Sequence, residues 1–341
     1  MSDIYNPINS ETTKNTEKKK KADDFNKSDA RGWTPLMRLA YSSQDIQAIK
    51  DLIDKGADIN IKGINGWSPL MAAIIGHNTP DVVQVLIDNG ADINSIDKTY
   101  KNILMRAVAI PANSQIIEKL IQNGADANAK DNKDKTVLMN ALYYSDDIGN
   151  IETLVRNGAD VNAKNKYGET PLMYAFRKYE NFDIIELLLK NGADVNARDD
   201  STETILMKAL DRHKTPEFIE KLIEFGADVN LKNKHGESPL IRAVYQSKNT
   251  GIIEILLKNG ADINIQTKDG FTPLMNAIRC PKKDKITELL IEQGADVNIT
   301  NHNGDTALSL AIQYSNKPEI IDLLIKKATA KMKTVNTEKG A

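Results

Sequence analysis

Histidine and cysteine, the residues that most often carry catalysis or bind metals, are few and scattered in this chain. The sequence has four histidines and one cysteine: His77, His213, His235, His302 and Cys280. The histidines never stand at the spacing of metal ligands. Arg279 precedes Cys280, and a neighbouring cation lowers the pKa of a thiol, but no histidine stands at a matching position to activate it. We therefore expect no catalytic residue, no metal, no cofactor, no small-molecule substrate and no enzymatic activity.

Composition narrows the class of protein further. The formal net charge of −2 gives no general attraction to nucleic acid, and no nucleic-acid-binding motif is present. A single cysteine cannot form an internal disulfide, which fits a reducing compartment. No apolar run is long enough to span a membrane, and the N-terminal residues lack the apolar segment of a cleaved signal. We expect a cytoplasmic monomer, with export by a non-classical route left open.

The tripeptide Gly-Ala-Asp recurs eight times at a constant spacing of 34 residues. It begins at Gly56, Gly90, Gly124, Gly158, Gly192, Gly226, Gly260 and Gly294. A fixed period of this size is typical of a stacked array in which each unit contacts only its neighbours. The periodicity assigns these aspartates to turns rather than to acid–base chemistry.

Each repeat is expected to contain two short helices followed by a turn. A helix-capping residue stands at the same place in all nine repeats, at Thr34, Ser68, Asn102, Thr136, Thr170, Thr204, Ser238, Thr272 and Thr306. Leucine follows two positions later in every repeat, and alanine three positions beyond it in eight of the nine. The second helix is expected to follow Asp45, Thr79, Asn113, Asp147, Asn181, Thr215, Asn249, Lys283 and Lys317. The glycine of Gly-Ala-Asp would then end that helix in a left-handed conformation.

These residues resemble the ankyrin-repeat family. The resemblance rests on the opening Gly-x-Thr-Pro-Leu, as at 168–172 and 270–274, and on the closing Gly-Ala-Asp-Val-Asn, as at 158–162 and 192–196. Both motifs recur in phase over residues 29–327, as eight full repeats and a ninth that stops after its second helix. The resemblance implies an all-α fold with short β-hairpin-like turns, an ankyrin-repeat solenoid. A tetratricopeptide array has the same period but is purely helical, and it would lack the Gly-Ala-Asp-x-Asn turn.

The chain departs from the family pattern in three ways. Each unit is one residue longer than the usual 33, with the extra residue in the loop between the helices. Methionine replaces the family's histidine after Thr-Pro-Leu in seven repeats, and methionine can only pack. In repeats three, four and six the turn glycine is replaced by Tyr100, Asp134 and Thr202. If that turn needs a positive φ these residues are strained, so we expect these three repeats to be the least stable.

In ankyrin-like arrays the hairpin tips and the first helices line a concave groove, which the resemblance implies is the binding face. Counted from the capping residue, positions −4, −3, −1, +4, +7 and +8 are expected to be exposed there. Over nine repeats, sixteen of these sites are basic and seven are acidic, and they hold ten of the eighteen aromatic residues. The residues expected to contact a partner are Trp33, Arg38, Trp67, Lys101, Arg106, Lys135, Tyr143, Tyr144, Tyr167, Tyr174, Arg177, Arg212, Arg242, Tyr245, Phe271 and Arg279. The alternative is that these lysines and arginines are ordinary solvent-exposed residues of helix surfaces and that the tyrosines are half-buried between repeats.

The sequence thus predicts a non-enzymatic scaffold that binds a protein with an acidic surface in a basic, aromatic groove. The polar segments 1–28, which include Lys18–Lys21, and 328–341 are expected to be disordered tails. An alternative is an adaptor that acts on host proteins as an effector of an intracellular bacterium or a large virus, with recruitment through the tails. This alternative rests only on a composition rich in lysine, asparagine and isoleucine.

Overall fold

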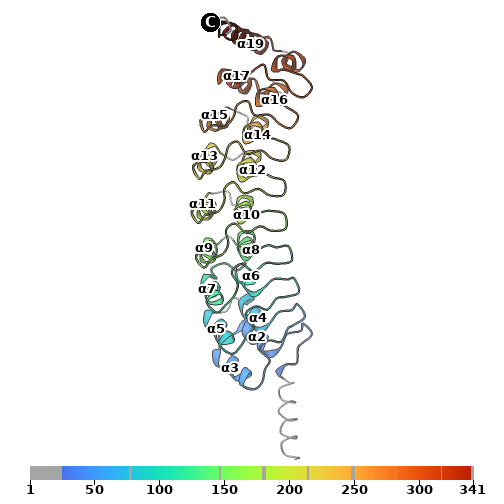
Figure 1. Ribbon diagram of the computed structural model, residues 1–341. Helices are drawn as coiled ribbons and strands as arrows, with labels where there is room; N and C mark the ends of the chain where they lie inside the picture. Colours follow the sequence, from blue (N-terminus) through green and yellow to red (C-terminus); the bar gives the residue numbers. More distant parts are fainter. Residues whose placement is uncertain are drawn as a thin grey trace, which may run out of the picture. The chain divides into compact units, whose positions relative to one another are not determined.

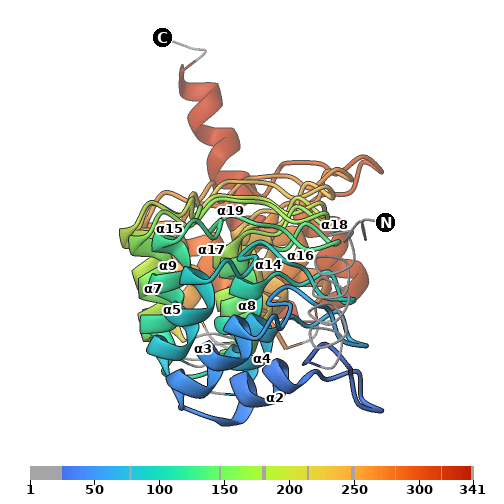
Figure 2. The same cartoon turned by 90° about the horizontal axis from the view of Figure 1, so that it is seen from below.

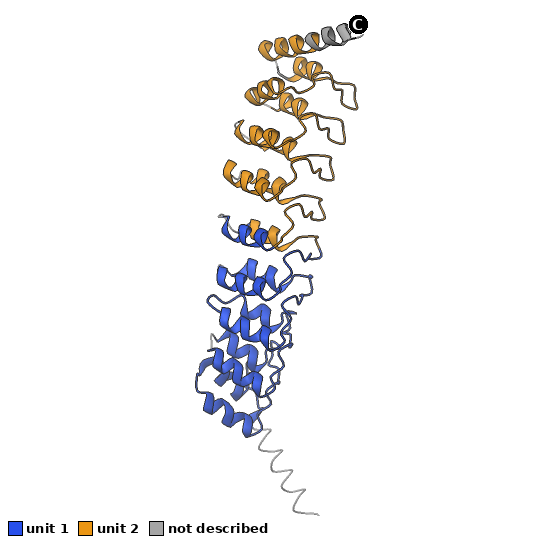
Figure 3. Cartoon of the chain, turned by 60° about the vertical axis from the view of Figure 1, so that its left-hand side comes forward, with its two compact units in different colours: residues 1–166, 177–191 blue, residues 167–176, 192–341 orange. Residues whose placement is uncertain are grey.

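The computed structural model describes residues 25–338, except 77–78, 146, 179–181, 213–214, 247–249, 281 and 316. Most of the predicted N-terminal tail, including Lys18–Lys21, therefore lies outside the described residues. The chain divides into two compact units, drawn in different colours in Figure 3. Unit 1 comprises residues 1–166 and 177–191, and unit 2 comprises residues 167–176 and 192–341.

Helix pairs make up both units, as the capping pattern predicted. Unit 1 holds α2 (Pro35–Ser42), α3 (Ile46–Asp54), α4 (Pro69–Ile75), α5 (Pro80–Asp88), α6 (Ile103–Ala107), α7 (Ser114–Gln122), α8 (Val137–Tyr144), α9 (Ile148–Arg156) and α11 (Asp183–Lys190). Unit 2 holds most of α10 (Pro171–Lys178), then α12 (Ile205–Asp211), α13 (Pro216–Glu224), α14 (Pro239–Gln246), α15 (Gly251–Lys258), α16 (Pro273–Arg279), α17 (Asp284–Glu292), α18 (Ala307–Leu310), the π-helix η1 (Ala311–Ser315) and α19 (Pro318–Glu338).

Within each unit the helices form two rows (Figure 1). The first helix of a repeat packs on its own second helix and on the first helix of the next repeat, as α4 does on α5 and α6, and α14 on α15 and α16. In unit 1 the second helices α5, α7 and α9 stack behind one another when seen along the row (Figure 2). The hairpin loops project beside the row of first helices (Figure 1). The described hairpins contain only isolated antiparallel bridges, Ile96 with Asn102 and Lys130 with Thr136.

The predicted capping residues start the first helices. In eight repeats the side-chain oxygen of that residue accepts a hydrogen bond from the backbone N–H three residues later. Thr170 is the exception among the described residues, because its Oγ1 has no hydrogen-bond partner. The methionine or isoleucine three residues after the cap is buried in the first eight repeats, which confirms that it packs. In the ninth repeat Ser309 takes this place and closes a capping box with Thr306.

The second helices follow the prediction less closely. Asp45, Asp147 and Thr215 accept capping hydrogen bonds as predicted. The predicted caps Asn181 and Asn249 lie outside the described residues. The helices after them, α11 and α15, take the next residue as cap, without a side-chain hydrogen bond, and so begin one residue late.

An asparagine ladder joins successive turns. In the turn after Gly-Ala-Asp, the Asn60 side chain accepts from the N–H of Asp92 at 2.7 Å and donates to the carbonyl of Gly90 at 3.0 Å, one repeat further on. The side chains of Asn128, Asn196 and Asn230 accept and donate the equivalent pair of hydrogen bonds. Each turn therefore holds the end of the second helix of the next repeat. Periodicity alone indicated that these asparagines belong to turns, but not that they bond to the next repeat.

The ladder moves one predicted boundary of the array. Asn26 accepts from the N–H of Asp58 at 2.7 Å, as the later ladder asparagines do for the turns that follow them. The repeat pattern thus already holds at Asn26, before the predicted start at residue 29.

The other boundary also differs from the prediction. The α19 helix continues to Glu338, so residues 328–338 are helical where we expected a disordered tail. The segment lacks proline and glycine until Gly340, so nothing in it breaks the helix.

Three turn residues adopt the left-handed conformation that the sequence suggested. Tyr100, Asp134 and Thr202 have φ values of 60°, 56° and 59°. Where glycine holds this position the next hairpin comes close, so that a Cβ on Gly236 would lie 2.6 Å from the backbone nitrogen of Lys268. That nitrogen donates to the carbonyl of His235 at 3.1 Å. Among the described residues, no such backbone bond joins the hairpins that follow Tyr100 and Thr202 to the preceding hairpin.

Replacing Tyr100 or Thr202 by glycine is expected to stabilise its repeat by about 1 kcal/mol, because glycine removes the cost of a positive φ. The control is Gly168→Ala at the same turn position, whose Cβ would lie 2.9 Å from the nitrogen of Asp200 and should destabilise. Amide exchange followed repeat by repeat measures both changes. Uniform protection across the wild-type array would contradict the prediction that repeats three, four and six are the least stable.

Candidate functional site

The predicted contact residues divide unevenly between the two units. Of the sixteen basic residues predicted on the binding face, ten belong to unit 1 and six to unit 2. All seven acidic residues predicted on that face belong to unit 2: Glu169, Asp200, Glu203, Asp211, Glu237, Asp269 and Asp305. Asp131 and Asp134 in the hairpins of unit 1 reduce this positive excess but do not cancel it. By this count the predicted binding-face positions are mainly basic in unit 1 and mixed in unit 2.

A cluster of tyrosines and lysines lies on this face of unit 1. Tyr143 and Tyr144 end α8 with 56% and 49% of their surface exposed, and their rings meet edge to face at 4.8 Å. The Lys101 Nζ lies 3.9 Å from the centroid of the Tyr144 ring, and the Lys135 Nζ lies 5.2 Å from that of Tyr143. Lys178 Nζ donates to the carbonyls of Tyr143 and Ser145 at 3.1 and 3.0 Å. We call the first four residues the tyrosine–lysine cluster; it combines exposed aromatic surface with two ammonium groups.

Two predicted anchors of unit 1 are engaged within the chain. Arg106 forms an ion pair with the buried carboxylate of Asp97, with Nε 2.7 Å from Oδ2. Arg38 forms the same kind of pair with Asp29. In unit 2, Lys208 pairs with Asp199 at 2.8 Å. In each case an acidic hairpin residue stands nine positions before a basic residue of the first helix, a spacing that is visible in the sequence.

The environment of Asp97 lowers its pKa. Burial alone would raise this pKa, but hydrogen bonds from Thr99 and Arg106 and from the backbone N–H groups of Lys101 and Thr99 outweigh it. Asp97 therefore holds its hairpin to α6 as an ionised group.

Acid is expected to weaken this hairpin. The folded-state pKa of Asp97 is below the unfolded value near 3.8, so its contribution is complete above that value and is lost as pH falls below it. The Asp97→Asn variant should be less stable than wild type at pH 7 and should lose less stability between pH 5 and 3, which thermal unfolding measures. Asp131→Asn removes the charge of the equivalent turn carboxylate, where Asn140 and no arginine stands nine residues on, and is the control. Equal pH dependence of wild type and Asp97→Asn would contradict the assignment.

Arg242 in unit 2 lies among three carboxylates. Its guanidinium pairs with Glu203, with Asp211 at 2.6 Å and with Glu237 at 3.0 Å, and its side chain is only 17% exposed. Burial alone would lower the Arg242 pKa, but the three carboxylates together raise it. The residue therefore joins repeats six and seven internally, and little of its charge faces solvent.

The expectation that position +4 is exposed was wrong in five repeats. Tyr174 is only 4% exposed, and the other buried residues at this position are Ala72, Asn140, Asn276 and Leu310. Neighbouring first helices pack against each other, as α4 does on α6 and α14 on α16, and they cover this position. Tyr174 therefore offers no surface to a partner in this structure.

The remaining predicted residues of unit 2 form separate contacts. Arg212 lies over the ring of the buried Phe176 at 5.2 Å, and Arg279 lies 4.5 Å from the ring centroid of Phe271. The Tyr245 hydroxyl donates to Asn276 Oδ1 at 2.7 Å. Desolvation raises the Tyr245 pKa. Tyr167 is 49% exposed at a hairpin tip.

Cysteine and histidine chemistry finds little support in the described structure. Burial raises the Cys280 pKa and outweighs the lowering by Lys283 and by Arg279, so the net shift is opposite to the one that Arg279 alone would give. His77 and His213 lie outside the described residues, and His235 and His302 lie at hairpin tips. No group of histidine, cysteine, aspartate and glutamate side chains in the described ranges could hold a metal ion. None of the described helices is both long and apolar enough to cross a membrane.

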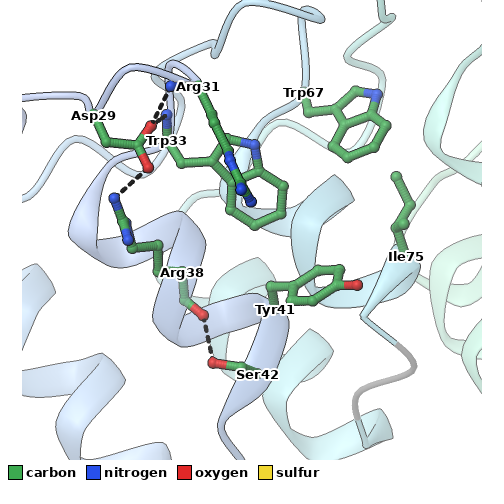
Figure 4. Close-up of a pocket in the computed structure, with 8 residues that line it drawn as sticks. All are labelled: Asp29, Arg31, Trp33, Arg38, Tyr41, Ser42, Trp67 and Ile75. Carbon is green, nitrogen blue, oxygen red and sulfur yellow. Dashed lines mark hydrogen bonds and ion pairs between the residues drawn. The ribbon is translucent and has the colours of Figure 1, made fainter.

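The first two repeats of unit 1 form an open pocket of about 460 Å³ (Figure 4). The predicted residues Trp33, Trp67 and Arg38 line it together with Asp29, Arg31, Tyr41, Ser42 and Ile75. Tyr41 was not among the predicted contact residues, although it occupies position +7 on the predicted face.

Comparison with known protein families agrees with the repeat geometry. A family model described as "Ankyrin repeats (3 copies)" matches residues 11–97, 104–199, 198–267 and 246–336. A comparison with curated proteins found no match. The family match covers most of the chain, and the capped helix pairs within it recur with the 34-residue period. The chain therefore belongs to the ankyrin-repeat family, with an all-α ankyrin-repeat solenoid as its fold.

Proposed function

We propose that this protein binds a partner protein with an acidic surface on the hairpin and first-helix face of unit 1. Ankyrin repeats generally mediate protein–protein interaction, and the family is typically non-enzymatic, which supports binding rather than catalysis as the activity. The observation that carries the finer proposal is the division of charge: the binding-face positions of unit 1 are basic without an acidic residue, and those of unit 2 are mixed. Such a face speeds the encounter with an acidic partner.

The contacts of the individual side chains indicate which residues would lie at the centre of the interface. Arg38 and Arg106 are neutralised by Asp29 and Asp97, so their charges contribute little to an outside ligand. The tyrosine–lysine cluster instead presents two exposed aromatic rings with ammonium groups beside them. Aromatic side chains supply interface area at low entropic cost. The cluster is therefore the proposed centre of the interface.

Charge reversal at matched positions tests the proposal. Lys98→Glu with Lys166→Glu changes two exposed lysines of unit 1 at position −4, and Lys234→Glu with Lys268→Glu makes the same change at position −4 in unit 2. A partner isolated by affinity capture from nuclease-treated extract should bind the first variant about tenfold or more weakly and the second nearly as well as wild type. Calorimetry with the purified partner measures both affinities, and circular dichroism confirms folding.

The outcomes separate the possible binding modes. Equal weakening in both variants would indicate nonspecific attraction to cations and contradict the proposed face. Full affinity in both would move the interface away from the hairpins of unit 1. An affinity that survives both variants but is lost when residues 1–24 are removed would support recruitment through the tail instead.

A further inference from the structure

The pocket of repeats one and two has aromatic walls. The Trp33 ring meets Tyr41 edge to face at 5.1 Å and Trp67 at 6.0 Å, and Ile75 lies on the same lining (Figure 4). Tyr41 is 42% exposed. The volume of about 460 Å³ is within the usual range for pockets that hold a small group. The pocket can therefore accept one bulky apolar side chain of a partner.

The charges around the pocket determine which charged residue can stand next to the apolar side chain in the partner. Asp29 is occupied within the chain, since it accepts from the N–H groups of Arg31 and Trp33 at 2.8 and 2.9 Å and pairs with Arg38. These hydrogen bonds, that of Trp33 foremost, lower the Asp29 pKa despite partial desolvation, so its charge is present and is balanced by Arg38. The exposed guanidinium of Arg31 has no ion pair among the described residues. The pocket therefore carries one uncompensated positive charge.

This balance disfavours a cationic ligand. An aromatic cage can bind quaternary ammonium groups through the ring faces. Here the ring edges meet ring faces within the pocket, and Arg31 at the lining would repel a second cation. A carboxylate, in contrast, could form a bidentate pair with the planar guanidinium.

We infer that this pocket binds an aromatic or branched aliphatic side chain of a partner peptide that carries an aspartate or glutamate next to it. The apolar side chain lies between Trp33, Trp67 and Tyr41, and the carboxylate pairs with Arg31. This inference rests on the proposed function, because it assigns to the acidic partner a specific anchor at one end of the unit 1 face.

The chain provides its own reporter for this pocket. Trp33 and Trp67 are the only two tryptophans in the sequence, so emission excited at tryptophan wavelengths comes from this pocket alone. The probe is a tryptophan-free synthetic peptide with the central sequence Asp-Phe-Asp, titrated into the full chain. Control peptides replace phenylalanine by alanine, both aspartates by lysine, or phenylalanine by trimethyl-lysine.

The expected result is a saturable change of emission with the Asp-Phe-Asp peptide and at least about fivefold weaker binding of all three controls. Arg31→Glu should weaken the binding of the Asp-Phe-Asp peptide by a similar factor and should bind the Lys-Phe-Lys peptide more tightly than the Asp-Phe-Asp peptide. Arg31 is exposed, so this variant should fold, and Arg31→Gln serves if it does not. Trp67→Phe keeps an aromatic wall and should retain the peptide, with emission from Trp33 only.

Three results with the wild-type chain would overturn the inference. The first is no saturable change of emission with the Asp-Phe-Asp peptide. The others are a Lys-Phe-Lys peptide that binds as tightly as the Asp-Phe-Asp peptide, or a trimethyl-lysine peptide that binds more tightly than it. The proposed function is judged separately, by the matched lysine reversals and the captured partner. A partner that needs Lys98 and Lys166 but tolerates Arg31→Glu would leave the proposed function standing and exclude the pocket as its anchor.

Discussion

Leu138→Ala should lower the free energy of unfolding of repeat four and its neighbours by about 3 kcal/mol, because it removes a fully buried side chain and leaves a cavity. Leu138 is 0% exposed, in α8. The α8 helix packs on α6 and α9, so the cavity would border two repeats. Local amide exchange of these helices is the measurement, since a repeat array need not unfold in a single two-state step.

Leu308→Ala provides the matched control. Leu308 holds the same position in the ninth repeat, but it is only half-buried. Its replacement is expected to cost about 1 kcal/mol, in proportion to the smaller apolar area it buries. Equal costs at the two positions would mean that burial between repeats does not set the stability of the array.

Arg242→Ala is expected to destabilise repeats six and seven by roughly 2–3 kcal/mol, because it leaves three carboxylates close together with only Lys208, beside Glu203, as a cation. Glu203, Asp211 and Glu237 are each 20–28% exposed at their side chains, so water offsets part of the full cost of a buried unpaired charge. Arg279→Ala, at an exposed position over Phe271, is the control and should cost less than about 1 kcal/mol. Urea unfolding of unit 2 followed by amide exchange measures both.

A compensated variant makes the electrostatic assignment falsifiable. Arg242→Met combined with Glu203→Gln, Asp211→Asn and Glu237→Gln removes the cation and the three anions together, and it should recover most of the loss. If this variant is as unstable as Arg242→Ala, the arginine acts mainly through its packing and not through its charge. Partner binding by unit 1 should be unaffected in either case.

The sequence alone determined where most of the helices begin and end and which turn residues adopt a left-handed conformation. The 34-residue period, the capping residues and the closing glycines fix where the first helices begin and where the second helices end, because each depends on local backbone chemistry. The same reasoning identified Tyr100, Asp134 and Thr202 as left-handed, since their neighbours in register are glycines. Local signals were weaker for the second helices: at α11 and α15, which begin one residue later than predicted, no cap side chain holds the first turn.

Only the tertiary structure decided which predicted binding residues are available. Tyr174 is buried, and Arg242 is joined to Glu203, 39 residues earlier, because stacking brings repeats together. The pocket of Trp33, Tyr41 and Trp67 likewise needs two repeats in contact. A repeat sequence specifies its own helices because caps and turns act within a few residues. Exposure and ion pairing are set by the neighbouring repeat, whose side chains differ at the same positions.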